Sequence, residues 1–117
     1  MTENTPFAPT TRKGEVRGQM WDDLKAAHDH GRIRATAVRA SDFFGPGVDQ
    51  SSYGERCFGR LAQGKPAELL GDPAAHHAVT FVPDFGEALV RAAERPASWG
   101  QAWLAPTAPA VPQQQLV

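Results

Sequence analysis

The stretch that most constrains the fold is a short predicted strand that stops abruptly in a glycine-proline turn. Residues 32–40, RIRATAVRA, contain enough small and β-branched side chains to form a strand. The run Gly45-Pro46-Gly47 forces a turn shortly afterwards, and the polar residues Ser41 and Asp42 stand at the junction. Open α/β sheets commonly present their binding sites where a strand ends in this way, so the segment is the first candidate for a site.

Apolar spacing and capping signals predict three helices around this strand. The first runs from about Lys13 to His30, the second covers 53–63 with Ser52 and Glu55 as a capping box, and the third is capped by Asp84 and Glu87 and ends at Pro96. Gly31 is placed to end the first helix in a left-handed cap.

Further short strands are expected at 67–70 and at 102–104, and residues 76–84, HHAVTFVPD, are expected to form a half-buried extended segment in which Val79 and Phe81 alternate with Thr80. The alternation of helices and strands indicates a mixed α/β architecture, although the strands are too few to close both faces of a doubly wound sheet. The sequence therefore divides the chain into three segments. These are an N-terminal loop over 1–12, a folded part over 13–105, and a Pro/Gln-rich tail over 106–117 that we expect to be disordered.

Charge and hydropathy disfavour nucleic acid and membranes as partners. The 12 basic and 13 acidic residues give a formal net charge of −1, so no broad positive field attracts polyanions. No apolar run approaches the roughly 20 residues that span a bilayer, and the amino end does not resemble a signal peptide. We therefore expect a cytoplasmic protein without nucleic acid or membrane partners. Its single cysteine, Cys57, is expected to be a buried apolar side chain.

Three stretches in sequence order resemble one protein family. Residues 39–47, RASDFFGPG, are similar to the Arg-x-x-Asn-x-Tyr-Gly-Pro-Gly element that follows the sixth strand of extended short-chain dehydrogenases. Residues 54–72 and 76–96 resemble the next two elements of that family, the NAD-dependent epimerase/dehydratase type. The resemblance implies a partial Rossmann-like α/β fold, namely the C-terminal half of an extended short-chain dehydrogenase with its substrate-side subdomain.

The resemblance also implies a catalytic lysine, but its usual partner is missing. The family uses a Tyr-x-x-x-Lys pair in which the lysine lowers the tyrosine pKa and holds the nicotinamide ribose. Lys13 stands at the place of that lysine, whereas Pro9 occupies the place of the tyrosine. The neighbouring hydroxyls belong to Thr10 and Thr11, and a threonine hydroxyl is a far weaker acid than a phenol.

By the same resemblance, one group of residues is expected to contact substrate and another to contact cofactor. The substrate-binding candidates are Ser41, Asp42, Phe43, Phe44 and His77, and the cofactor-binding candidates are Lys13, Arg39 and Ala40. His77 stands where nucleotide-sugar members carry an arginine that grips the diphosphate, and histidine lacks that bidentate fork. A smaller or less charged substrate is therefore expected.

The cofactor implied by the resemblance is NAD or NADP, but no Gly-x-x-Gly-x-x-Gly fingerprint or related motif occurs in the 117 residues. We therefore expect the chain to be inactive alone, with the dinucleotide-binding half encoded elsewhere or lost. The alternative is a non-catalytic interaction or small-ligand-binding module derived from the family. The family also suggests a homodimer through the helix at 13–30. No histidine pair completes a zinc spacing, so no metal is expected.

Overall fold

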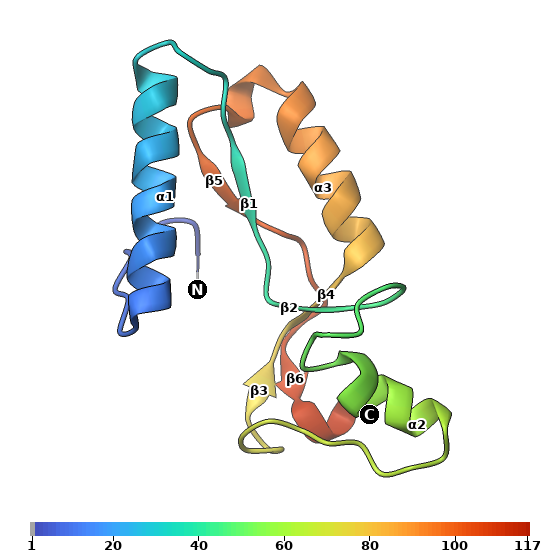
Figure 1. Ribbon diagram of the computed structural model, residues 1–117. Coiled ribbons are helices and arrows are strands. Elements are labelled where there is room, and N and C mark those ends of the chain that lie inside the picture. Colours follow the sequence, from blue (N-terminus) through green and yellow to red (C-terminus); the bar gives the residue numbers. More distant parts are fainter. Residues whose placement is uncertain (1) are drawn as a thin grey trace. The chain divides into compact units, whose positions relative to one another are not determined.

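The computed structural model describes residues 2–117, which form two compact units (Figure 1). The first unit contains the chain up to Arg39 together with Leu89–Leu104, and the second contains Ala40–Ala88 together with Ala105–Val117. Helices combine with short parallel and antiparallel strand pairs, so the predicted partial Rossmann-like α/β class is confirmed. Within residues 2–117, no helix combines the length and apolar character needed to cross a membrane.

The longest helix of the first unit is α1, Arg12–Asp29, and both of its ends have identifiable causes. At its start, the Thr11 side chain accepts a hydrogen bond from the Gly14 amide at 3.2 Å, which satisfies one orphan backbone donor. At its end, Gly31 has a φ of +72°, as the sequence predicts. No side chain of α1 is buried.

A parallel pair, β1 (Ala37–Arg39) with β5 (Ala102–Leu104), forms the sheet of the first unit. The strand expected over 32–40 is thus confined to its last part. His28 of α1 packs beside this pair: its Nδ1 accepts from the Ala35 amide at 3.2 Å, and its ring lies against Gly100. Ala35 and Ser98 are buried in this region, where small side chains allow the segments to approach closely.

Helix α3, Val82–Glu94, begins two residues before the predicted cap. Asp84 therefore lies in the first turn rather than preceding it, where its charge favourably faces the positive end of the helix. Pro83 is compatible with this early start, because backbone amides of a first turn have no intrahelical partner. A short 3₁₀ helix, Pro96–Ser98, follows α3, so the predicted stop at Pro96 is close to the observed one.

The second unit contains two strand pairs. Strand β2 (Asp42–Phe44) runs parallel to β4 (Val79–Phe81), with Asp42 opposite Val79 and Phe44 opposite Phe81. Strand β3 (His76–His77) runs antiparallel to β6 (Val111–Pro112). Thr80, in the middle of β4, is fully buried, and its hydroxyl lies 3.0 Å from that of Ser41.

The helix predicted over 53–63 is present, but it starts as a π-helix at Gly54–Gly59 and continues as α2 at Arg60–Ala62. Ser52 does not cap it. Instead the Ser51 hydroxyl accepts from the Tyr53 amide at 3.2 Å and donates to the Phe43 carbonyl oxygen, which ties the helix start to β2. Cys57 is fully buried on this helix, as predicted.

The strand predicted at 67–70 is a further difference from the structure. Residues 67–70 are not a strand; the segment is held by a backbone bond from Glu68 to Arg56 and by an ion pair between Glu68 and Arg60 at 3.2 Å. A short apolar run cannot be assigned from periodicity alone, because it needs a pairing strand.

The tail expected to be disordered over 106–117 instead contains β6 and a 3₁₀ helix, Gln113–Gln115. Within this segment Gln113 is buried, and its side-chain amide makes three hydrogen bonds within the second unit. The composition of the tail gives no sign of these contacts, because the partners of Gln113 lie far away in the sequence.

Candidate functional site

The site begins at the turn after β2, where the backbone needs glycine. Gly45 has a φ of +118° and Gly47 a φ of +76°, conformations that L side chains rarely adopt. Gly45 is also short of space, because a Cβ built on it would meet the Phe81 ring at 2.8 Å. Both the conformation and the close approach therefore explain the Gly-Pro-Gly sequence that the analysis singled out.

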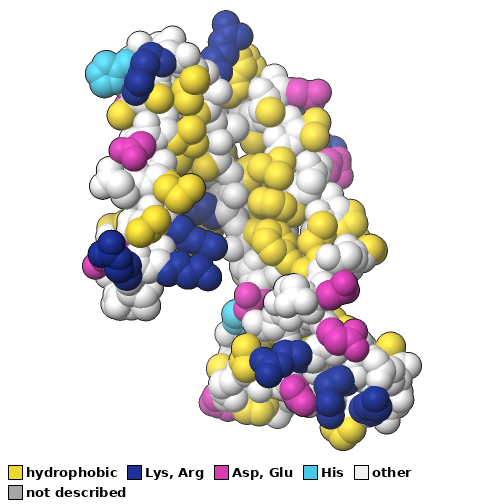
Figure 2. Space-filling view, in the orientation of Figure 1, with side chains coloured by type: hydrophobic (Ala, Val, Ile, Leu, Met, Phe, Trp, Pro, Cys, Tyr) yellow, Lys and Arg dark blue, Asp and Glu magenta, His cyan; other side chains and the backbone are white. Residues whose placement is uncertain are grey.

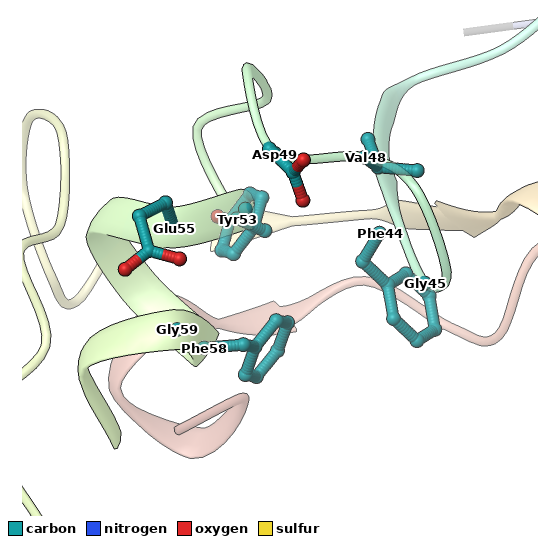
Figure 3. A pocket seen from close by; sticks show the side chains of 9 residues that line it. Phe44, Gly45, Val48, Asp49, Tyr53, Glu55, Phe58 and Gly59 are labelled. Atoms are coloured by element: carbon teal, nitrogen blue, oxygen red, sulfur yellow. The ribbon is translucent and has the colours of Figure 1, made fainter. Parts of the chain in front are cut away.

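Beyond this turn lies an open groove of about 460 Å³. Its lining comes from the end of β2, the following loop and the π-helix (Figure 3): Phe44, Gly45, Val48, Asp49, Tyr53, Gly54, Glu55, Phe58 and Gly59. Three aromatic rings form its walls, with Phe44 and Phe58 at 6.0 Å and Tyr53 and Phe58 at 6.3 Å between centroids. A groove of this size and character suits a small organic molecule.

Asp42 and His77, both predicted to bind substrate, contact each other. The His77 Nε2 lies 3.0 Å from an Asp42 carboxylate oxygen, and both side chains are partly exposed. The His77 ring also stacks on the ring of Tyr53, with centroids 5.6 Å apart and an interplanar angle of 27°. The pair is therefore connected to the groove through a residue that lines it.

Tyr53 itself is buried, and its hydroxyl donates a hydrogen bond to the Gln113 Oε1 at 2.9 Å. Burial raises the pKa of this phenol, and the negative charge of Asp42, with that of Cys57 where its thiol is ionised, raises the pKa further. Tyr53 therefore remains a neutral donor at physiological pH. Sequence reasoning missed both Tyr53 and Gln113, although Tyr53 is the only tyrosine of the chain.

The other predicted substrate-binding residues have different surroundings. Phe44 lines the groove, whereas Phe43 packs on Phe85 of α3 with centroids 5.0 Å apart. The Ser41 hydroxyl is within hydrogen-bonding distance of buried Thr80. The structure therefore brings Phe44, Asp42 and His77 to or beside the groove, while Ser41 and Phe43 make contacts that stabilise the β2–β4 pair.

The predicted cofactor residues do not form a recognisable phosphate site. Lys13 is exposed in the first turn of α1, and the Arg39 guanidinium lies over the Phe7 ring at 4.3 Å. Ala40 is an exposed residue between β1 and β2. Pro9, in the place of the family tyrosine, approaches Gly14 and presents no hydroxyl.

The residues that line the groove of the second unit also do not fit a dinucleotide. A pyrophosphate needs backbone amides at a helix start and positive charge, whereas the groove is lined by the carboxylate residues Asp49 and Glu55 and by no basic side chain. The Gly45–Gly47 turn leads into this groove and not into a helix start. Nor do three His, Cys, Asp or Glu side chains gather as a metal site anywhere in residues 2–117.

Fold and site together define a small α/β protein of the Rossmann-related class, with a ligand-sized groove beside the end of a parallel strand. Residues 1–103 match the sequence profile of the NAD dependent epimerase/dehydratase family. The chain therefore belongs to the NAD dependent epimerase/dehydratase family, as the three sequence stretches predict. Comparison with curated proteins gives no significant match.

Proposed function

We propose that this chain provides the substrate-side part of an NAD(P)-dependent epimerase-, dehydratase- or reductase-type enzyme, with the dinucleotide held by residues outside this sequence. The observation that carries the proposal is the aromatic groove at the end of β2, in a chain whose family match covers residues 1–103. Ligands of α/β folds commonly bind beyond the carboxyl ends of the strands, which is where this groove lies.

The groove also supports a small substrate without a diphosphate. Its volume of about 460 Å³ is in the lower part of the range for small-molecule sites. No arginine or lysine lines it, so a diphosphate has no charge partner there. His77, in the position of the family's diphosphate-binding arginine, is paired with Asp42 instead.

Titration of the isolated chain with NADH, followed by its fluorescence, tests where the dinucleotide binds. We expect no detectable binding, because the residues present form no pyrophosphate cradle. Lys13→Ala serves as the matched variant. Micromolar NADH binding that weakens in Lys13→Ala would contradict the proposal and would assign the cofactor site to this chain.

A second candidate is a non-catalytic small-ligand module, favoured by Pro9 in the place of the catalytic tyrosine. It requires the isolated chain to fold cooperatively. A cooperative thermal transition followed by near-ultraviolet circular dichroism would support the module. A non-cooperative state that binds the dye ANS would rule it out and favour the enzyme part, which then needs its missing half to fold.

We also propose that α1 mediates a homodimer, because two of its apolar side chains are exposed. Val16 is 50% and Met20 is 65% exposed. Residues four apart lie on the same face of a helix, so Val16 and Met20 suit a helix–helix contact. Sedimentation equilibrium of the chain and of Met20→Glu tests this: the dimer should dissociate in the variant, and a monomeric parent chain would refute the proposal.

A further inference from the structure

The residues of the groove divide into an aromatic surface and a negatively charged rim. Phe44 and Phe58 present π-systems whose faces carry negative electrostatic potential, and Tyr53, buried and stacked on His77, completes the aromatic lining. Asp49 and Glu55 add two carboxylates to the same lining, and no lysine, arginine or histidine belongs to it. The groove is thus apolar and electronegative at once, a combination that attracts cations with an organic body.

Asp49 is the carboxylate best placed to pair with such a ligand. In the close-up its carboxylate points toward the space between the Tyr53 and Phe44 rings (Figure 3). Within residues 2–117 the Asp49 side chain has no hydrogen bond or ion pair, so its charge is available to a ligand. Glu55, by contrast, accepts a hydrogen bond from the Gln63 amide at 3.1 Å.

The cations nearest in sequence do not neutralise this rim. Arg56 and Arg60 follow Glu55 on the same helical segment, but both pair with Glu68, at 3.7 and 3.2 Å. Neither arginine lines the groove. The helix therefore directs its basic side chains to one partner and leaves the aromatic groove with carboxylates alone.

We infer that this groove binds a small organic ammonium ion, with the cationic nitrogen near Asp49 and the apolar body against Phe44, Tyr53 and Phe58. The inference rests on the proposed function in taking the groove as the substrate site, and it adds the charge of the ligand. Cation–π attraction and the ion pair between the ligand and Asp49 both favour a cation. Each is expected to change the affinity for the ligand about two- to fivefold.

Three probes of matched shape test the charge preference: benzylamine, which is a cation at neutral pH, benzyl alcohol, which is neutral, and benzoate, which is an anion. Binding to the full chain is followed by the backbone amide shifts of the groove residues in NMR spectra. We expect benzylamine to bind most tightly, benzyl alcohol less tightly and benzoate least. Added salt should weaken the binding of benzylamine alone.

Two variants separate the contributions. Asp49→Asn should weaken benzylamine binding about two- to fivefold and leave benzyl alcohol unchanged. Asp84→Asn, which removes one charge from α3 outside the groove lining, is the matched control and should leave both unchanged. Phe58→Leu should reduce the preference for the cation without reversing it.

The results also separate this inference from the proposed function. Benzoate or benzyl alcohol binding as tightly as benzylamine would overturn the charge preference but leave the groove a substrate site. Shifts at residues outside the groove, or no binding by any probe, would overturn the inference altogether. The NADH titration stays independent, because it concerns where the dinucleotide binds.

Discussion

The two units of this protein are stabilised in different ways. The second unit contains the fully buried side chains Thr80 and Cys57, together with a buried phenol, Tyr53, that is hydrogen bonded to a buried amide. In the described part of the first unit, the buried side chains are the small ones of Ala35 and Ser98. Its helical segments leave Val16, Met20, Leu89 and Val90 exposed, and Figure 2 shows hydrophobic side chains exposed along α1 and α3.

The site-bearing unit therefore has its own specific core, whereas the first unit exposes large apolar side chains on both of its helical segments. The chain offers a separate probe for each. All three tryptophans, Trp21, Trp99 and Trp103, belong to the first unit, and the single cysteine, Cys57, belongs to the second. Burial raises the pKa of the Cys57 thiol, so its alkylation should report opening of the second unit.

The largest effect is expected from Gly54→Ala in the second unit. A Cβ at this position would overlap the backbone carbonyl oxygens of Val48 and Asp49, which cannot move aside as a flexible side chain can. We expect a loss of about 3 kcal/mol in the free energy of unfolding, measured by urea titration with Cys57 alkylation as the probe.

Gly86→Ala in α3 is the matched control for Gly54→Ala. Nothing lies within 4 Å of its added methyl, so it should raise the free energy of unfolding by about 0.5–1 kcal/mol rather than lower it. If tryptophan fluorescence shifts in Gly54→Ala as much as cysteine reactivity does, the two units unfold together and the proposed contrast between them is wrong.

The next effect is expected from Gln113→Ala. It removes the acceptor of the Tyr53 hydroxyl and the donor to the carbonyl oxygens of Leu70 and Asp72, at 2.9, 3.0 and 3.1 Å. Leaving these groups without partners should cost about 2 kcal/mol. Gln114→Ala, at an exposed neighbouring position, should cost almost nothing in the same urea titration. Equal losses in the two variants would show that the tail contributes no specific contact.

A smaller effect should appear at high pH. The Tyr53 pKa is raised in the folded state above its usual value of 10.0, so the unfolded chain loses this proton first. The contribution of Tyr53 to the free energy of unfolding is fully present below about pH 10. It declines as the pH rises toward the pKa of Tyr53 in the folded state. Urea titrations at increasing pH should show this loss of stability in the parent chain. The Tyr53→Phe variant should lack the share of the loss that comes from ionisation of Tyr53.

The smallest effect concerns the first unit and has the opposite sign. Gly18 lies inside α1 with nothing within 4 Å of an added Cβ, so Gly18→Ala should stabilise the helix by about 0.5–1 kcal/mol. Gly14→Ala should stabilise the helix less, because the Cβ added at this position would lie 3.0 Å from the Cβ of Pro9. Trp21 fluorescence during thermal unfolding measures both, and equal gains would show that the Pro9 contact does not constrain Gly14.

Local chemical rules allowed much of the fold to be predicted from the sequence. Helix α1 ends as expected because Gly31 can adopt a positive φ, and the strand predicted at 102–104 matches β5. The extended segment predicted over 76–84 contains β3 and β4, although Thr80 rather than Phe81 is its buried side chain. The early start of α3 and the absence of Ser52 from the helix cap were not predicted, since several residues near a helix start can satisfy the same backbone groups.

The candidate site was predicted only in part. The segment Asp42–Phe44 and its turn were identified because glycine and proline restrict the backbone whatever surrounds them. Tyr53 was missed because its significance comes from partners rather than from a motif. The Gln113 contact was missed for the same reason, as it joins residues 60 positions apart.

The sequence alone determined the family, the presence of the three main helical segments and the turn beside which the groove forms, because each depends on neighbouring residues or on spacing along the chain. Only the tertiary structure decided that Asp42 meets His77, that the tail supplies a buried amide, and that three aromatic rings and two carboxylates line one groove. These features depend on strand register and on which distant segments pack together, and a one-residue shift in register reverses the face of every side chain.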